Sequence, residues 1–311
     1  LIGAHGSPLS GKANILERIS DYRDSIQFMW DQTVRCANLG LTLNETIAAI
    51  RLPPYFKKHY TTQQFYGVVE HHIRQIYTGL FGWFDEDEAN LFPTPAPHRA
   101  QKLISGFGGI SRVRDEIDEA LETKDFRWAI EVSSWLVRSE VNETGRADAG
   151  EAEDRKRLAK ALRGVAQSTT SANIRNWCIT RAMELDGTIS LDRFRIHRFH
   201  KREVLSRPAS ESLALLRVLL VPAKASEVED EIIVTFSDGS SAGLALRHCV
   251  AVPSSGANAT VSMTISHEHW AEILGGKMTL SKAMAEGFIK TDDENRIIRF
   301  FSCFDLNTLN S

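Results

Sequence analysis

The sequence has few cysteines, and no two of them stand at a spacing typical of metal binding or redox chemistry. Its 311 residues include four cysteines and no Cys-x-x-Cys motif. They are Cys36, Cys178, Cys249 and Cys303. Such wide spacing argues against a zinc knuckle or a thioredoxin-like site. We therefore expect four reduced residues in the core, and reduced thiols favour a cytoplasmic location.

Long apolar runs and an excess of basic residues are also missing. No apolar run reaches the roughly 20 residues that a membrane-spanning helix needs, and the N-terminus lacks the features of a signal peptide. The net charge of -3 argues against a general nucleic-acid-binding protein. Residues 193–202 alternate basic and aromatic side chains, but a linker or an edge strand explains this pattern better than nucleic-acid contact. The sequence predicts neither a transmembrane segment nor a nucleic-acid partner.

What remains is the composition of a globular protein, with 42% hydrophobic and 25% charged residues in a chain long enough for two domains. From about residue 15 to 167, apolar residues recur at helical spacing. From Pro208 onward, short alternating strands and amphipathic helices follow each other. We therefore predict a mixed fold class, with an all-α helical domain followed by an α+β domain of sheet and helices.

The first residues read as the end of a strand that runs into a loop. There is no initiator methionine, and one strand is not stable without partners for its backbone. We expect residues 1–21 to be the tail of a domain that is mostly absent from this chain or is supplied by another polypeptide. His5 stands where a strand ends, a place from which metal ligands often project, although a lone loop histidine is usually not a ligand.

The helical part is organised around residues 52–85, between a Pro-Pro break and a Gly-Trp turn. The residues expected on the buried face of its central helix are Val69, Ile73, Ile76 and Leu80. Their spacing predicts one apolar stripe. His71, Arg74 and Thr78 point the other way and would present a cationic face to an anion. Ordinary solvation of that face is the alternative interpretation.

The C-terminal part alternates strands and helices. We expect strands at residues 231–236, 244–250 and 261–265, with a hairpin turn at Asp238-Gly239. Helices are predicted near 267–274 and 278–285, and a last strand at 296–302. His267 and His269 are two residues apart on a helix and therefore do not face one ligand. A sheet covered by helices commonly encloses an apolar cleft.

Several short motifs occur in the order in which alkylsulfatases carry them. They are His5-x-x-Pro8 with Gly11, Tyr22-Arg23-Asp24, Asp31-Gln32-Thr33, Leu52-Pro53-Pro54, Tyr66-Gly67, His71, Gly82-Trp83-Phe84-Asp85, Asp125-Phe126-Arg127-Trp128-Ala129 and Arg175-Asn176-Trp177. Each motif is short, and their common order carries the resemblance. On these residues the chain resembles the alkylsulfatase family of zinc hydrolases over essentially its whole length.

The resemblance implies a domain order. In that family a metallo-β-lactamase-like catalytic domain precedes a helical dimerisation domain and a sterol-carrier-protein-like domain. We accordingly expect residues 1–21 to be the tail of the first, 22–190 to be the dimerisation domain, 191–206 a linker or edge strand, and 207–311 the sterol-carrier-protein-like α+β domain. A homodimer and an alkyl sulfate, or another amphipathic anion, are the implied partners.

The resemblance also implies site residues. His5 matches the histidine that closes the family's two-zinc site, and His71 matches a histidine that contacts the sulfate group. Trp83 stands where the family usually has a sulfate-contacting tyrosine, and an indole presents no hydroxyl. No His-x-His-x-Asp-His cluster occurs, so at most one zinc ligand is present and the catalytic residues are unassigned.

Two functions follow from these observations. The first is the C-terminal part of a zinc-dependent alkylsulfatase-like hydrolase, inactive alone, which provides dimerisation, one wall of the sulfate pocket and an apolar cleft. The alternative is a stand-alone, non-catalytic protein that dimerises and binds a lipid-like ligand in its C-terminal domain.

Overall fold

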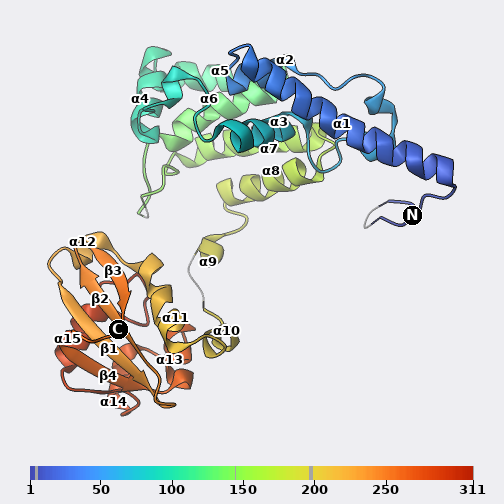
Figure 1. Cartoon of the computed structure of the whole chain (residues 1–311). Coiled ribbons are helices and arrows are strands. Elements are labelled where there is room, and N and C mark those ends of the chain that lie inside the picture. The colour runs from blue at the N-terminus through green and yellow to red at the C-terminus, as the bar shows by residue number, and fades with distance from the viewer. Residues whose placement is uncertain (4–5, 144, 196–198, 311) are drawn as a thin grey trace. The chain divides into compact units, whose positions relative to one another are not determined.

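The computed structural model describes residues 1–3, 6–143, 145–195 and 199–310. The chain divides into two compact units, Leu1–Ser190 (unit 1) and Leu191–Ser311 (unit 2) (Figure 1). Unit 1 is built of helices, and unit 2 contains a five-stranded mixed sheet with helices. The predicted fold class is thereby confirmed. In the part of the chain that the structure describes, no helix is long and apolar enough to cross a membrane.

Unit 1 begins with its longest helix, α1 (Lys12–Asn38). The boundary that we expected between residues 21 and 22 falls inside this helix, because the sequence has no glycine or proline between Gly11 and Gly40 to interrupt it. Helix α2 (Leu43–Ala49) follows, with the expected capping box between Thr42 and Glu45.

The rest of unit 1 consists of short 3₁₀ turns and further helices. They are η1 (Phe56–Lys58), η2 (Tyr60–Thr62), α3 (Val69–Phe81), η3 (Glu88–Asn90), α4 (Ala96–Gly106), α5 (Ile110–Glu122), α6 (Phe126–Arg138), α7 (Ala152–Ser168) and α8 (Ala172–Leu185). Helices α4, α5 and α6 share one apolar cluster, and α7 and α8 share a second. A small third cluster of Cys36, Ile50 and Ile73 joins α1, α2 and α3.

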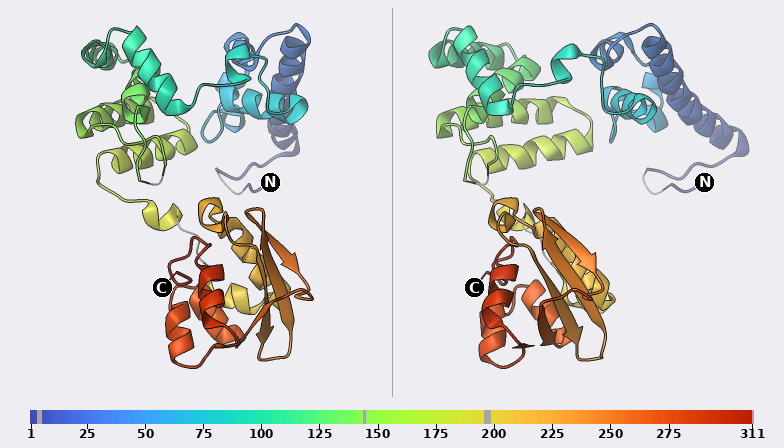
Figure 2. Two further views of the ribbon diagram at one scale, coloured as in Figure 1. Left: turned by 90° about the vertical axis from the view of Figure 1, so that its left-hand side faces the viewer. Right: turned by 60° about the vertical axis from the view of Figure 1, so that its left-hand side comes forward.

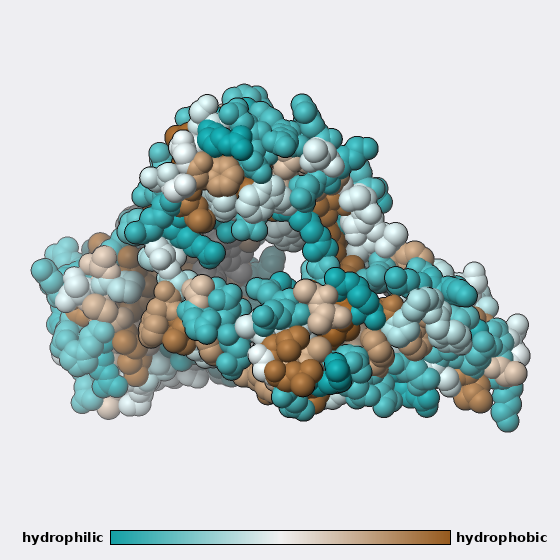
Figure 3. Space-filling view, turned by 90° about the horizontal axis from the view of Figure 1, so that it is seen from above, coloured by the Kyte–Doolittle hydropathy of each residue, from teal (hydrophilic) through white to brown (hydrophobic). Residues whose placement is uncertain are grey.

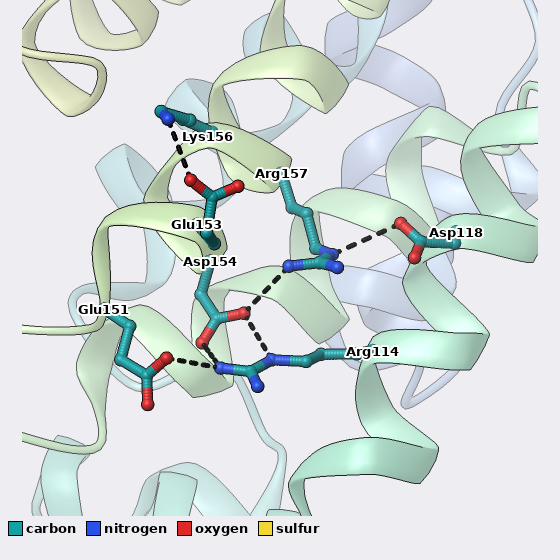
Figure 4. Close-up of polar contacts among 7 residues, drawn as sticks. All are labelled: Arg114, Asp118, Glu151, Glu153, Asp154, Lys156 and Arg157. Carbon is teal, nitrogen blue, oxygen red and sulfur yellow. Dashed lines mark hydrogen bonds and ion pairs between the residues drawn. The ribbon is translucent and has the colours of Figure 1, made fainter.

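A network of ion pairs joins α5 to α7 (Figure 4). Arg114 donates two hydrogen bonds to Asp154, of 2.8 and 2.7 Å, and a third of 2.8 Å to Glu151. Arg157 contacts both Asp118, at 3.2 Å, and Asp154, at 3.3 Å. Asp154 is 3% exposed, so this carboxylate is a buried charge that two arginines neutralise.

The edge-strand alternative for residues 191–206 is wrong in the described part of that range. Helix α9 covers Asp192–Arg195 and α10 covers Lys201–Leu205, and residues 196–198 lie outside the described ranges. Helix α10 packs on a later helix of unit 2 and buries Val204 completely. The edge strands of the sheet are β3 and β5, so neither edge is formed by the described residues of this segment.

Unit 2 arranges a mixed sheet in the order β3-β2-β1-β4-β5. The C-terminal helices, drawn in red, lie beside this sheet (Figure 2). Its elements are α11 (Ala209–Ala214), η4 (Leu215–Leu219), α12 (Pro222–Ala225), β1 (Asp230–Phe236), β2 (Ser241–Arg247), β3 (Val250–Ser254), β4 (Val261–Ile265), α13 (His267–Leu274), α14 (Leu280–Ala285), β5 (Lys290–Thr291) and α15 (Glu294–Phe301). Strands β1 and β4 are parallel, and the other pairs are antiparallel. Strands β3 and β5 were not predicted.

The strand that we expected at residues 296–302 is wrong, because the segment forms helix α15. The apolar residues Ile297, Phe300 and Phe301 are fully buried and follow one another at helical spacing. Asp293 caps the helix by accepting a hydrogen bond from the backbone of Arg296. The composition of this run is typical of a strand, but its period and its cap are those of a helix.

One of the four cysteines lies outside the core, contrary to expectation. Cys36, Cys178 and Cys303 are buried, and all four are free thiols. Cys249 is partly exposed in the two-residue turn between β2 and β3, which it forms with His248. Both turn residues have positive φ, 51° and 58°, as a type I′ turn requires. The expected strand at 244–250 ran through this turn.

Candidate functional site around helix α3

Helix α3 is anchored by one apolar face. Ile73 and Tyr77 are fully buried, and the Tyr77 ring packs 4.9 Å from that of Phe81. Val69 and Ile76 are half-buried, as their spacing predicts. The prediction that Leu80 lies on the buried face is wrong, because this side chain is 40% exposed and Tyr77 occupies the corresponding position one turn after Ile73.

The opposite face is open to water as expected, since His71, Arg74 and Thr78 are all exposed. Arg74 donates a 3.1 Å hydrogen bond to the side chain of Asn44 in α2. Glu70, the carboxylate next to His71, accepts two bonds of 3.1 and 2.7 Å from Arg127 in α6. These bonds hold the pKa of Glu70 below its ordinary value. Arg127 thus compensates the negative charge closest in sequence to His71.

His72 lies against a different surface from His71. It lines a hollow of about 260 Å³ with residues of α1 and of the segment before α3. Burial lowers the pKa of His72, and the neighbouring charge of His71 lowers it further. A Cβ atom on Gly67 would lie 2.4 Å from His72 Nε2, so a side chain at this position would displace the His72 ring. We did not predict a role for this histidine from the sequence, and the Tyr66-Gly67 motif was the available signal.

The segment before α3 is held by the start of α8. The backbone amide of Ala172 donates to the carbonyl of Phe65 at 2.7 Å, and Thr170 Oγ1 donates to the carbonyl of Gln64 at 3.0 Å. Ser171 Oγ donates to the carbonyl of Tyr66 and also caps α8. Residues about 105 positions apart therefore fix the loop that shapes the hollow.

Trp83 lies at the other end of α3 from His71. It follows Gly82, whose φ of 89° ends the helix, and its side chain is 75% exposed. Its ring lies 5.5 Å from that of Phe84. An α-helix rises about 1.5 Å per residue, so the ten residues from His71 to Phe81 span about 15 Å. Within one chain, the structure does not bring His71 and Trp83 side by side.

A metal site is not formed by the residues that the structure describes. His5, the expected ligand, lies outside the described residues. Across residues 1–3, 6–143, 145–195 and 199–310, no three histidine, cysteine, aspartate or glutamate side chains gather closely enough to hold a metal ion. The described residues therefore do not provide the ligands of a two-zinc centre.

Unit 2 fills its interior with aromatic side chains. Trp270, Phe236, Phe300 and Phe304 are at most 1% exposed. A separate hollow of about 420 Å³ lies at the surface beside the β2–β3 turn. Its lining is Arg217, Val218, Leu220, Cys249, Val250 and Ala251. One cation beside apolar side chains suits an amphipathic anion.

Comparison with known proteins places these features in a family. The model for alkyl sulfatase dimerisation matches residues 42–188. A linear primary-alkylsulfatase of Pseudomonas sp. is 31% identical over 98% of this chain and 58% of its own length. An (R)-specific secondary-alkylsulfatase of Pseudomonas sp. is 26% identical over 98% of this chain and 45% of its own length.

The fold is shared as well. The structure of the stereoselective inverting sec-alkylsulfatase Pisa1 from Pseudomonas sp. superposes with a TM-score of 0.76 at 24% identity, over 96% of this chain and 46% of that protein. The chain spans about half the length of the relatives that it matches. The chain therefore matches the C-terminal part of alkylsulfatases, and residues 42–188 match the dimerisation domain of that family.

Proposed function

We propose that this chain is part of a zinc-dependent alkylsulfatase-like hydrolase, in which water cleaves the sulfate ester of an alkyl chain to an alcohol and hydrogen sulfate. The observation that carries the proposal is the extent of the match, which reaches 98% of this chain in a linear primary-alkylsulfatase. Both units, and not the dimerisation domain alone, are therefore shared with that relative.

In this proposal the chain does not hold the metal centre by itself. We assign one zinc ligand to His5, which lies outside the described residues, and the remaining ligands to a part of the protein that this chain does not contain, since the described residues gather no metal-binding cluster. The chain instead contributes homodimerisation through its helical unit and one wall of the sulfate pocket. It also contributes an apolar surface, for which the hollow beside the β2–β3 turn is our candidate.

His71 is the residue that we assign to the sulfate. Its imidazole is exposed in the first turn of α3, where the helix dipole favours a bound anion. Arg127 compensates the charge of the adjacent Glu70, which would otherwise repel an anion. Trp83 offers only one indole donor, and about 15 Å of helix separates it from His71, so we assign it a secondary contact at most.

The natural protein that contains this chain provides the test. A charge-assisted hydrogen bond contributes about 1.5–3 kcal/mol, so His71→Ala should lower kcat/KM for octyl sulfate by about 10- to 100-fold. His98→Ala, at an exposed histidine of α4, is the matched control and should leave kcat/KM unchanged. Equal kcat/KM values for the two variants would contradict the assignment of His71 to the sulfate pocket.

The metal assignment and the alternative function are tested on the same protein. His5→Ala should lose zinc and activity together, and unchanged zinc content would contradict its role as a ligand. The intact natural protein should have a mass well above the 34.8 kDa of this chain. A mass of 34.8 kDa together with absent sulfatase activity would favour the stand-alone, non-catalytic protein.

A further inference from the structure

Three consecutive residues at the start of α8 hold three consecutive backbone carbonyls of the segment before α3. Residues 170–172, here called the α8 clamp, each donate one hydrogen bond to a carbonyl of residues 64–66. Thr170 and Ser171 donate through their hydroxyls, and Ala172 donates through its backbone amide. A run of three such bonds fixes both the place and the direction of the segment, because each carbonyl is bonded separately.

The α8 clamp uses donors that a helix cannot satisfy by itself. The first amides of an α-helix have no carbonyl one turn earlier to bond. Ala172 is the first residue of α8, and its amide donates to the carbonyl of Phe65 at 2.7 Å. Ser171 is the N-cap, whose Oγ accepts a 3.3 Å bond from the amide of Ile174 while it donates to the carbonyl of Tyr66. One hydroxyl therefore both caps α8 and holds the distant segment.

Ser171 is the side chain of the α8 clamp that water does not reach. Hydrophilic residues cover much of the face of the molecule seen in Figure 3, and water competes for hydrogen bonds at such a surface. Ser171 is 0% exposed, whereas Thr170 is exposed. A bond that water cannot replace contributes more to the position of a segment than an exposed one. We therefore expect Ser171 to have the larger effect of the two.

The clamped segment leads directly into the first turn of α3. The backbone of Gln64 is held by the α8 clamp, and its side-chain carbonyl accepts a 2.9 Å bond from the amide of Val69, the first residue of α3. The carbonyl of Val68, the N-cap, accepts bonds of 3.0 Å from the amides of His71 and His72. The α8 clamp is thus connected to the backbone of His71 through a short stretch of hydrogen-bonded chain.

The restraint on this turn from α6 is exposed to water. Glu70 pairs with Arg127, and the two side chains are 41% and 81% exposed. An exposed ion pair restrains its partners little, because water and salt screen it. The α8 clamp therefore adds a buried restraint close to the imidazole that we assign to the sulfate.

We propose that Ser171 is a positioning residue for His71, acting through residues 64–66 and the first turn of α3. The proposal rests on the assignment of His71 to the sulfate in the proposed function, and it names a distant residue that fixes the place of this imidazole. Ser171 touches neither the substrate nor a metal ion. Its role is to hold the turn, because a small misplacement of a binding group lowers a reaction rate steeply.

A double-mutant cycle in the natural protein that contains this chain tests the coupling. Ser171→Ala should lower kcat/KM for octyl sulfate by about 10-fold. In the His71→Ala protein, the same substitution should lower kcat/KM by less than about 2-fold, because the imidazole on which Ser171 acts is gone. An equal loss in both proteins would overturn the proposal, since a merely structural role does not depend on His71.

Two further variants sharpen the cycle. Ser168→Ala is the matched control and should leave kcat/KM unchanged, because its hydroxyl donates to carbonyls of its own helix, Gly164 and Val165. Thr170→Val should lower kcat/KM by about 2- to 3-fold, and Thr170→Ser, which keeps the hydroxyl, should restore it. Unchanged kcat/KM in His71→Ala would contradict the proposed function. A loss in His71→Ala without any loss in Ser171→Ala would overturn the positioning role alone.

Hydrogen exchange of the same protein measures the position of the segment without reference to activity. Ser171→Ala should make the amides of residues 66–72 exchange about 5- to 10-fold faster, and Ser168→Ala should not. Exchange in α4 and α5 should be the same in both variants. Unchanged exchange at residues 66–72 would overturn the hold of Ser171 on this segment. Faster exchange with unchanged kcat/KM would show that Ser171 holds the segment without acting on His71, which also overturns the proposal.

Discussion

Unit 2 buries one continuous apolar cluster, whereas unit 1 divides its buried side chains among three separate clusters. In unit 2 the sheet and the helices share a centre that Trp270 and several phenylalanines fill. In unit 1, ion pairs also join helices that are far apart in the sequence, as in the pairs of Arg114 with Asp154 and of Arg157 with Asp118. One layer packed on a sheet produces a single core, while successive helix pairs produce several small ones.

The difference bears on function. Unit 2 covers its large apolar residues by itself, with exceptions such as Val218 and Val250 beside its surface hollow. Unit 1 leaves a row of apolar side chains on α1 exposed, namely Leu16, Ile19, Tyr22, Ile26 and Trp30. The match to the dimerisation model, at residues 42–188, also lies in unit 1.

The largest expected effect on stability comes from a substitution at the centre of the core of unit 2. Phe300→Ala should lower the free energy of unfolding of unit 2 by about 3–5 kcal/mol, because it leaves a cavity in the single core. Hydrogen exchange measured by mass spectrometry should show faster exchange throughout unit 2 and unchanged exchange in unit 1. Ile298→Ala, at a partly exposed neighbour on α15, should cost less than about 1 kcal/mol. Equally faster hydrogen exchange in both units would show that they unfold together. It would contradict the contrast between the single core of unit 2 and the separate clusters of unit 1.

The second largest effect comes from a substitution that breaks the charge network of unit 1. Asp154→Asn leaves Arg114 and Arg157 without their shared carboxylate. Breaking a buried ion pair lowers the free energy of unfolding by about 3–5 kcal/mol. Because both arginines are partly exposed, we expect unit 1 to lose about 2 kcal/mol. Urea unfolding monitored by hydrogen exchange in α5 and α7 measures the change.

The control for that variant is the adjacent residue on the same helix. Glu153 pairs with Lys156 in water, as Figure 4 shows beside Asp154. Glu153→Gln should change the stability of unit 1 by no more than about 0.5 kcal/mol. Similar losses of unfolding free energy for Asp154→Asn and Glu153→Gln would mean that burial of the charge network contributes nothing to the stability of unit 1.

The smallest effect compares backbone strain in the two units. Lys124 follows α5 with a φ of 63°, and Cys249 lies in the β2–β3 turn with a φ of 58°. Lys124→Gly and Cys249→Gly should each stabilise their own unit by about 0.5–1 kcal/mol, because glycine adopts positive φ without steric cost. Differential scanning calorimetry should show one transition moving in each variant. Thr123→Gly, at a φ of -77°, should instead destabilise unit 1.

The sequence predicted elements whose signals are local. The capping box of Thr42 and Glu45 and the Pro-Pro break after α2 act within a few residues of themselves, and the structure confirms them. The exposed cationic face of α3 followed from helical spacing alone. The family was also recognisable, because short motifs in a fixed order are a property of the sequence.

Where two local signals competed, the sequence was insufficient. Residues 296–302 have the composition of a strand and the period of a helix, and burial against unit 2 together with the Asp293 cap decided for the helix. Strand β3 was missed because His248 and Cys249 lack the usual signature of a turn, although β2 and β3 pair across them.

The sequence by itself determined the fold class, the helix ends marked by caps and prolines, and the family. Only the tertiary structure decided which distant residues meet: Arg114 with Asp154, 40 positions apart, and Ser171 with Tyr66, 105 apart. It also separated His71 from Trp83 along α3 and left a row of apolar side chains on α1 exposed. The physical reason is that periodicity and capping act within a few residues, whereas burial depends on which surfaces the folded chain brings together.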